Sequence, residues 1–499
     1  MATEPQNPDV ETQHLRRKVA KLEADEAEAA AKLAPAIRLA TALPGINVKA
    51  IEKKLRSDRG FVWLKRHLTP RQQYAVNHLG IPALNFQHEA RRIYPLGSLA
   101  SHALGFTDID NKGLAGIERY FDKELRTRQD DMALSIDVRV QHVLEHELSA
   151  AVKKFSAIGA AGLVMDVNTG EVIAMSSLPR FDSNRPGAIE QALHFNRTTL
   201  GVYEMGSTFK IFTTAMALDA GTVSLRGGYD ATNPIHISRF TIRDFHAKKR
   251  WLSVPEIFMY SSNIGTAKMA LDVGISGHQN FLSSIGMMKP VGIELSETGA
   301  PLSPNRWREI NSMTISFGHG LAVSPLHLVA GVSAMINGGI YRTPTLVRRD
   351  PAEIPRGKRV VTAETSSKMR RLMRLAVENG TGGKAAAPGY IVGGKTGTAE
   401  KASSRGYKAK ALISSFVAAF PMHKPKYVIL ALLDEAKGTK ETRGYATGGW
   451  VAAPVVGAVV QRIAPLLGLH PIKETDAVRD ALSIEVSSKS AREPRVASR

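Results

Sequence analysis

The sequence predicts an α+β fold, an antiparallel sheet flanked by helices, and two observations lead to this prediction. Early in the chain, Leu163–Val167 and Glu171–Met175 are apolar runs joined by the tight turn Asn168–Gly170, a pattern typical of a β-hairpin. Near the far end, Ile413–Phe420 and Tyr427–Leu433 predict a second antiparallel pair of strands. Because helical patterns fill the chain between the two pairs, we expect strands that are distant in sequence to complete one sheet.

The predicted helices alternate with loops between and after these strands. Ile211–Leu218 and Ser366–Asn379 each stop close to a glycine, a residue that commonly ends a helix. Val254–Tyr260 predicts a further short helix, and Trp450–Leu467 predicts a helix with one apolar face. Strands early and late with helices between them are typical of a layered α+β domain.

The length of 499 residues favours more than one domain, because a single hydrophobic core rarely grows that large. We expect a small, irregular amino-terminal domain in residues 1–150, in which the first 33 residues are an exposed helix or a frayed end. The main domain is expected in residues 151–468. Residues 469–499 are basic and contain little to bury, so we expect a disordered tail there.

Composition and charge restrict the possible function classes. Hydrophobic residues make up 43% and charged residues 22% of the chain, as in ordinary folded proteins. The net charge of +20 predicts attraction to anionic surfaces. The basic residues lack aromatic interleaving and zinc-finger spacing, so we expect no nucleic-acid partner. The chain has no cysteine, which excludes disulfides and thiolate chemistry.

We expect no membrane span and no export signal in this chain. A spanning helix needs about 20 consecutive apolar residues. The best early candidate, Ala29–Ile46, is interrupted by Lys32, Pro35, Arg38 and Pro44. The first residues also lack a basic region followed by an apolar core, which an export signal would need.

Ser207-Thr208-Phe209-Lys210 is the first motif that can carry chemistry. It opens a helical run, and residues three apart share one helix face, so Lys210 can bring its amine close to the Ser207 hydroxyl. Serine needs an adjacent base, which a desolvated lysine can supply, and a helix start offers free N–H groups to an oxyanion. The simpler alternative is that Ser207 caps a helix and Lys210 is solvated.

Two further motifs indicate a catalytic site only in combination with the first. Ser261-Ser262-Asn263 follows the helical stretch Val254–Tyr260, where a hydroxyl could relay a proton and an amide could hold a substrate carbonyl. Lys395-Thr396-Gly397-Thr398 precedes the late strand pair, and a glycine in an edge strand would let a substrate backbone approach. Its lysine and hydroxyls could bind a terminal carboxylate. Alone, each motif also fits an ordinary turn or loop.

Ser-x-x-Lys, Ser-x-Asn and Lys-Thr-Gly in this order are the signature of penicillin-binding proteins and the related β-lactamases. The chain resembles a class B penicillin-binding protein, and within that class the septal, cell-division peptidoglycan D,D-transpeptidase of Gram-negative bacteria. Arg91–Pro95, His102–Phe106 and Gly113–Glu118 resemble the amino-terminal pedestal domain of this family. The similarity extends over residues 50–465, and it implies the penicillin-binding transpeptidase fold, an antiparallel sheet flanked by helices as in serine β-lactamases.

The resemblance implies a role for each motif residue. By this resemblance the catalytic residues are the nucleophile Ser207, the general base Lys210, the proton relay Ser261, the substrate-orienting amide Asn263, and Lys395, and the substrate-binding residues are Thr396, Gly397 and Thr398. The backbone N–H groups of Ser207 and Thr398 would form the oxyanion hole. Met205 stands where the family usually has proline, and we expect activity to survive this change, because proline there only preorganises the turn.

The resemblance also implies location and partners. The family acts on peptidoglycan stem peptides, is acylated by β-lactam antibiotics, and works at the periplasmic face of the bacterial inner membrane with cell-division proteins that include a membrane glycosyltransferase. The family's membrane anchor has no counterpart before residue 50 of this chain. We expect no cofactor, since no metal cluster, phosphate loop or dinucleotide motif stands out.

Two alternative functions remain open at this point. A D,D-carboxypeptidase or β-lactamase would pass the acyl group to water, although such a hydrolase has no need of a large pedestal. A catalytically idle division scaffold would instead use the pedestal to recruit partners. The intact motif residues Ser207, Lys210, Ser261 and Lys395 argue against the scaffold.

Overall fold

The computed structural model describes residues 8–127, 130–237, 240–403, 406–473, 475–484 and 486. The chain divides into two compact units, residues 1–91 and 92–499. The predicted division into residues 1–150, 151–468 and 469–499 remains a prediction, because compact units need not coincide with functional domains.

The first unit is built from three helices. These are α1 (Pro8–Ala42), α2 (Val48–Leu55) and α3 (Pro70–Asn77). Asn47 caps α2, and Thr69 forms a capping box with Gln72 at the start of α3. The unit has a small core of its own, to which the helices contribute Ala36, Leu39, Ile51 and Val76, and the loop after α1 contributes Leu43. The side chains of residues 15–28 of α1 are exposed, as expected for an amino-terminal helix without an apolar stripe.

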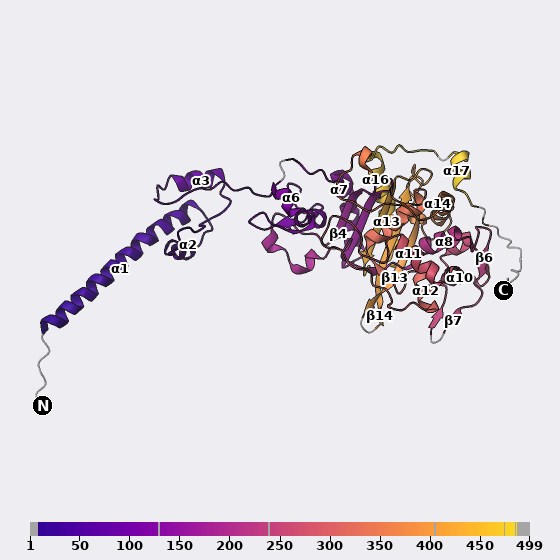
Figure 1. Cartoon of the computed structure of the whole chain (residues 1–499), viewed down its shortest axis with the longest axis horizontal. Helices are drawn as coiled ribbons and strands as arrows, with labels where there is room; N and C mark the ends of the chain where they lie inside the picture. Colours follow the sequence, from indigo (N-terminus) through magenta and orange to yellow (C-terminus); the bar gives the residue numbers. More distant parts are fainter. Residues whose placement is uncertain are drawn as a thin grey trace, which may run out of the picture. The chain divides into compact units, whose positions relative to one another are not determined.

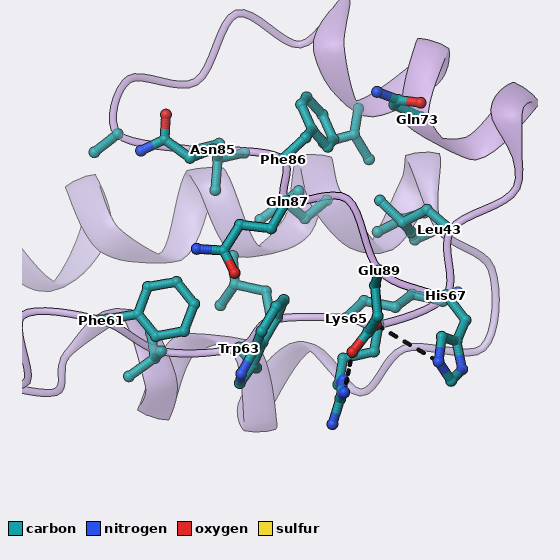
Figure 2. Close-up of a pocket in the computed structure, with 18 of the residues that line it drawn as sticks. Leu43, Phe61, Trp63, Lys65, His67, Gln73, Asn85, Phe86, Gln87 and Glu89 are labelled. Carbon is teal, nitrogen blue, oxygen red and sulfur yellow. Dashed lines mark hydrogen bonds and ion pairs between the residues drawn. The ribbon is translucent and has the colours of Figure 1, made fainter. Parts of the chain in front are cut away.

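A cavity of about 430 Å³ lies within the first unit, and Figure 2 shows the side chains around it. Phe61 and Trp63 meet edge to face, with ring centroids 5.1 Å apart. Glu89 accepts a hydrogen bond from Arg66 and lies 3.5 Å from His67. None of the residues that the sequence analysis singled out for catalysis lines this cavity.

The second unit begins with short elements. They are α4 (Ser101–Leu104), β1 (Phe106–Thr107), β2 (Gly113–Ala115), α5 (Gly116–Tyr120) and α6 (Asp122–Thr127). β1 and β2 pair antiparallel. Arg92 and Glu118 form an ion pair with an N···O distance of 2.6 Å, and Tyr94, Phe106 and Phe181 form a small aromatic core.

A five-stranded antiparallel sheet forms the centre of the second unit. Its strands, in spatial order, are β13 (Gly393–Ser403), β14 (Gly406–Phe420), β15 (Tyr427–Asp434), β3 (Gly159–Asp166) and β4 (Val172–Leu178). Both predicted hairpins are confirmed, as β3 pairs with β4 and β14 with β15. The prediction that distant strands complete the sheet is also confirmed, because β15 pairs with β3. In Figure 1 the early strands, in purple, lie beside the late strands, in orange.

Helices cover both faces of this sheet (Figure 1). On one face, α7 (Val138–Lys154) and α16 (Ala453–Leu466) share a core with Val164 of β3. On the other face, α8 (Lys210–Asp219), α13 (Pro325–Ile336) and α14 (Ala363–Glu378) share a core with Leu163 and Met165. Successive residues of β3 thus enter opposite cores, as the period of two in a strand requires. The predicted α+β class is confirmed.

Shorter elements complete the second unit. In chain order they are the 3₁₀ turns η1 (Pro186–Ala188) and η2 (Gln191–His194), β5 (Tyr203–Glu204), the 3₁₀ turn η3 (Gly206–Phe209), β6 (Gly228–Asp230), β7 (Ile235–Ile237), β8 (Phe240–Ile242), β9 (Trp251–Ser253), α9 (Val254–Tyr260), α10 (Asn263–Val273), α11 (Ile275–Ser284), α12 (Glu309–Ser316), β10 (Ala322–Val323), β11 (Ile340–Tyr341), η4 (Pro351–Glu353), β12 (Lys358–Arg359), η5 (Gly383–Ala385), α15 (Gly448–Val451) and α17 (Asp476–Leu482). β5 pairs with β10, and β6 pairs with β9.

Two carboxy-terminal segments bear on the sequence predictions. The stretch Gly448–Leu466 is long and apolar enough to cross a membrane, but Val459 and Ile463 in it are fully buried in the core shared with α7. Within the predicted disordered tail, residues 476–482 form α17, because Thr475 caps the helix and Leu482 is buried in the main core. Residues 487–499 of that predicted tail lie outside the described residues.

Replacing Phe416 tests the packing of the central sheet. This side chain is fully buried where β14 meets the α7 and α16 layer. We expect Phe416→Ala to lower the free energy of unfolding by about 3–5 kcal/mol, because it removes apolar contacts and leaves a cavity. Phe245 is 79% exposed, so Phe245→Ala should change this free energy by no more than about 0.5 kcal/mol. Denaturant titrations of both variants measure the difference, and equal effects would contradict the packing described here.

Candidate active site

Ser207 lies in the 3₁₀ turn η3, and α8 begins three residues later at Lys210. The sequence analysis placed Ser207 in the first turn of an α-helix. A 3₁₀ turn is wound more tightly than an α-helical turn, so the local structure differs from that prediction. Gly206 has φ of +54°, and a Cβ atom at this residue would lie 2.5 Å from the carbonyl oxygen of Thr398. Its N–H donates to Gly318 O at 3.2 Å. Only glycine therefore fits directly before Ser207.

The edge strand β13 lies against this turn. A Cβ atom on Gly397 would lie 2.6 Å from Met205 O and 2.9 Å from Thr208 Cγ2. The sequence analysis expected glycine here to admit a substrate backbone, whereas in the structure it admits the protein's own turn. The close approach brings the Ser207 segment next to Thr398. Met205 is almost fully buried, and its carbonyl oxygen accepts from the Thr208 hydroxyl at 2.9 Å.

The Ser261 hydroxyl lies between two buried lysines. Lys210 Nζ is 3.0 Å and Lys395 Nζ is 2.9 Å from Ser261 Oγ. Lys210 Nζ also donates to Ser261 O and, at 2.7 Å, to Asn263 Oδ1. Three segments that are far apart in the chain therefore converge, as the three motifs require.

Local backbone structure presents Ser261 to these lysines. The Ser261–Asn263 motif follows a helix, as predicted, and it joins two helices, since α9 ends at Tyr260 and α10 begins at Asn263. Ser261 has φ of +60° and ψ of +44°, a left-handed conformation that is unfavourable for serine. Such strain persists only where surrounding contacts hold it, and it is common at functional sites.

Burial changes the protonation of both lysines. It lowers the pKa of Lys210 well below its ordinary value, and the nearby Lys395 charge adds to this effect, while Asp244 opposes it. Burial lowers the pKa of Lys395 to about 7. Burying two ammonium groups beside one hydroxyl makes the neutral amine favourable.

A neutral Lys210 amine has two N–H protons and one lone pair. Ser261 O and Asn263 Oδ1 can only accept hydrogen bonds, so they occupy both protons. The lone pair then faces the Ser261 hydroxyl, whose Oγ lies 3.0 Å from Nζ, and it can accept a hydroxyl proton. Among the described residues no hydrogen bond joins Lys210 to Ser207, so the predicted contact between them remains a prediction.

Asp244 is a residue of this site that the sequence analysis missed. Its Oδ1 accepts from the backbone N–H of Asn263 at 2.6 Å and of Ile264 at 2.9 Å. Its Oδ2 accepts from the Ser262 hydroxyl at 2.7 Å. One carboxylate thus holds the residues that follow Ser261, Ser262 to Ile264, at the start of α10. Aspartate is common at helix starts, but Asp244 comes from another segment, and nothing in the sequence marks it.

The hydroxyl groups of β13 also have partners within the protein. Thr396 Oγ1 lies 2.8 Å from Thr381 Oγ1, and Thr398 Oγ1 accepts from Gly448 N–H at 3.0 Å. Since Thr398 accepts that bond, its own O–H proton can still be donated to a ligand. The structure therefore brings the eight predicted site residues into one region, around β13, η3 and the Ser261–Asn263 loop.

Comparison with known proteins shows which family combines this fold with this site. Residues 160–461 match the family described as the penicillin binding protein transpeptidase domain. The chain belongs to the penicillin-binding protein transpeptidase family. The matched residues include all of β3 except Gly159, the three motifs and β15.

Several relatives of this penicillin-binding protein match most of the chain. A probable peptidoglycan D,D-transpeptidase FtsI from Caulobacter vibrioides is 43% identical, over 89% of this chain and 77% of the relative. Peptidoglycan D,D-transpeptidase FtsI from Escherichia coli is 31% identical, over 82% of this chain and 73% of the relative. This penicillin-binding protein is therefore of class B and of the FtsI type.

A solved structure agrees with the fold. The transpeptidase domain of penicillin-binding protein 3 from Burkholderia pseudomallei has a TM-score of 0.62 and 33% identity, and the match covers 69% of this chain and 99% of that domain. The predicted penicillin-binding transpeptidase fold is confirmed.

The burial of Lys395 predicts an unusual dependence of stability on pH. Its pKa is about 7 in the folded protein and about 10.4 when unfolded, so the unfolded chain binds more protons between these values. The destabilisation is therefore complete below about pH 7 and disappears as the pH rises to about 10.4. We expect Lys395→Met to raise the free energy of unfolding by about 1–4 kcal/mol at neutral pH, and less at high pH. Denaturant titrations at several pH values measure this.

Lys401 on the same strand provides the control for this prediction. Its Nζ forms ion pairs with Asp434 at 2.9 Å and Glu435 at 3.0 Å. We expect Lys401→Met to lose stability, because it leaves the buried Asp434 carboxylate without its lysine partner. If Lys395→Met also lost stability at neutral pH, the account of Lys395 as a destabilising buried amine would be wrong.

Asp244 gives a second stability prediction. Asp244→Ala removes the acceptor for two backbone N–H groups and one hydroxyl, and we expect a loss of about 1–3 kcal/mol in the free energy of unfolding. Asp244→Asn keeps one acceptor oxygen and should lose less. Thermal or denaturant unfolding of both variants tests the order, and an alanine variant as stable as the parent would contradict the anchoring role.

Proposed function

We propose that this chain cross-links peptidoglycan as a septal D,D-transpeptidase, with Ser207 as the nucleophile that becomes acylated. The observation that carries the proposal is the Ser261 hydroxyl held at 3.0 Å from Lys210 and 2.9 Å from Lys395, both buried, beside the Ser207 turn. Buried amines of lowered pKa next to a serine are the arrangement that activates an otherwise weak nucleophile.

Lys210 acts as the general base in this proposal. Its neutral amine accepts the Ser207 proton while Ser207 Oγ attacks the carbonyl carbon of the penultimate D-alanine. The Ser261 hydroxyl, in contact with both lysines, relays that proton to the departing nitrogen of the terminal D-alanine. The backbone N–H groups of Ser207 and Thr398 stabilise the oxyanion. In the second step an amine of a neighbouring stem peptide displaces Ser207 and completes the cross-link.

Lys395, Thr396 and Thr398 orient the substrate in this proposal. The substrate ends in a carboxylate, and a carboxylate beside Lys395 favours the charged ammonium over the neutral amine. The Thr398 hydroxyl, which already accepts from Gly448, donates its proton to the same carboxylate. Gly397 allows the strand to lie close to η3, and Asn263 holds a substrate amide.

We also propose where the enzyme acts and with which proteins. Its relatives from Caulobacter vibrioides and Escherichia coli carry the name FtsI, which supports a role in septal wall synthesis. On this basis the enzyme works at the periplasmic face of the inner membrane, with cell-division proteins that include a membrane glycosyltransferase. The net charge of +20 fits a location beside anionic lipid headgroups.

Labelling with a fluorescent penicillin tests the proposed chemistry, because a β-lactam mimics the acyl-donor peptide. We expect the purified chain to form a covalent adduct, and Ser207→Ala to form none, since it lacks the attacking oxygen. Ser224→Ala, at a serine outside the site, is the matched control and should label fully. Labelling of Ser207→Ala at the parent rate would refute the assignment of the nucleophile.

The lifetime of the adduct separates the proposal from the hydrolase alternative. A transpeptidase keeps the penicilloyl group for many minutes, whereas a β-lactamase releases it to water within seconds. Chasing labelled protein with unlabelled penicillin measures this lifetime. Rapid turnover would favour the hydrolase.

A further inference from the structure

Residues 84–89 of the first unit have the sequence of a β-strand but no strand beside them. In their sequence, Leu-Asn-Phe-Gln-His-Glu, apolar or aromatic residues alternate with polar ones, the period of two that is typical of a strand. The chain runs from residue 84 to residue 94 without a turn or a bend, and this stretch belongs to no helix or strand. The segment is therefore extended, but it lacks the sheet that normally accompanies such a segment.

The backbone groups of residues 84–89 are unpaired. Within the described part of the chain, none of their N–H groups donates a hydrogen bond and none of their carbonyl oxygens accepts one. An unpaired strand edge is a template for pairing with another chain. A peptide that adds to such an edge gains affinity from main-chain hydrogen bonds and specificity from pockets that receive its side chains.

The cavity of about 430 Å³ supplies such a pocket directly beside this segment. All of residues 84–89 line it, and Phe61 and Trp63 line it from an earlier segment (Figure 2). Phe61 is 56% and Trp63 is 40% exposed, so solvent reaches both rings. Ligand pockets commonly measure about 300–1,000 Å³ and are lined by apolar and aromatic side chains. The unpaired edge and an accessible aromatic surface thus belong to one cavity.

The charges around the cavity favour an acidic occupant. Arg59, Lys65 and Arg66 line it, and Glu89 is the one carboxylate among its lining residues. Glu89 accepts a hydrogen bond from Arg66, which offsets its charge. Arg59 and Lys65 form no ion pair with any residue that the structure describes. Complementary charge on a partner would therefore be negative.

We propose that residues 84–89 bind an extended acidic segment of another protein, which pairs with them as an added strand and places side chains in the cavity beside Phe61 and Trp63. A small anion would meet Arg59 and Lys65 but would leave the main-chain groups unused. An extended peptide uses the edge, the aromatic surface and the cations together. The proposed site does not involve Ser207, so it is independent of the proposed acyl transfer.

Fluorescence anisotropy with a designed peptide tests this proposal on the full chain. The probe is a short fluorescein-labelled peptide in which valine and glutamate alternate. We expect this probe to bind, and we expect the same peptide with lysine in place of glutamate to bind at least about tenfold more weakly, because its charges match those of Arg59 and Lys65. No binding of the acidic probe, or equal binding of the two probes, would overturn the proposal.

Neighbouring proline variants test the strand pairing itself. Successive N–H groups of an extended chain point to opposite edges, so only one of Gln87 and His88 can donate to an added strand. Proline removes this N–H group and is compatible with an extended backbone. We expect one of Gln87→Pro and His88→Pro to bind the acidic probe about tenfold more weakly than its alanine counterpart, and the other to match its counterpart. If both matched their counterparts, main-chain pairing would be refuted.

Side-chain variants test the rest of the cavity. We expect Trp63→Ala to weaken binding of the acidic probe about tenfold, whereas Phe245→Ala, at an exposed aromatic residue of the second unit, should keep the parent affinity. Arg59 is exposed, so Arg59→Glu should fold normally and weaken binding about two- to threefold. Parent affinity in both Trp63→Ala and Arg59→Glu would overturn the site. Ser207→Ala should bind the probe like the parent, which separates this test from that of the acyl-enzyme.

Discussion

The site depends on the burial of two lysine amines beside one serine hydroxyl. In water each amine would be protonated and would repel the other. Buried by the α9–α10 loop, β13 and α8, Lys210 and Lys395 both have a lowered pKa, and Ser261 gives them a common partner. Burying these lysines lowers the stability of the folded state, and it also leaves an amine that can act as a base at neutral pH. The surrounding core keeps solvent away from the two lysines.

Two glycines determine how closely the Ser207 turn and the edge strand β13 can approach each other. Gly206 and Gly397 allow the nucleophile turn and the edge strand to approach until a single Cβ atom would clash with the opposing backbone. Asp244 then fixes the third segment through two backbone N–H groups and one hydroxyl. Positioning therefore comes from backbone contacts, which are stiffer than contacts between long side chains, and the chemistry comes from a few side chains placed upon them.

The sequence predicted the parts of this arrangement that have a local pattern. Alternating and apolar runs predicted β3, β4, β14 and β15, and the three motifs predicted Ser207, Ser261 and Lys395 at one site. Residues defined by distant contacts could not be predicted in this way. Asp244 looks like any loop aspartate until α10 is placed beside it. The tight turn at Ser207 likewise follows from β13, which comes much later in the chain.

The pairing of β15 with β3 has a consequence for how the enzyme comes into being. Asp434 lies opposite Gly159, so the sheet cannot close until residue 434 has been synthesised. Contacts between segments this distant form slowly, and their unpaired strand edges stay open to other chains in the meantime. The nascent polypeptide therefore lacks the complete sheet on which β13 presents Lys395 until β15 has been made and has paired with β3.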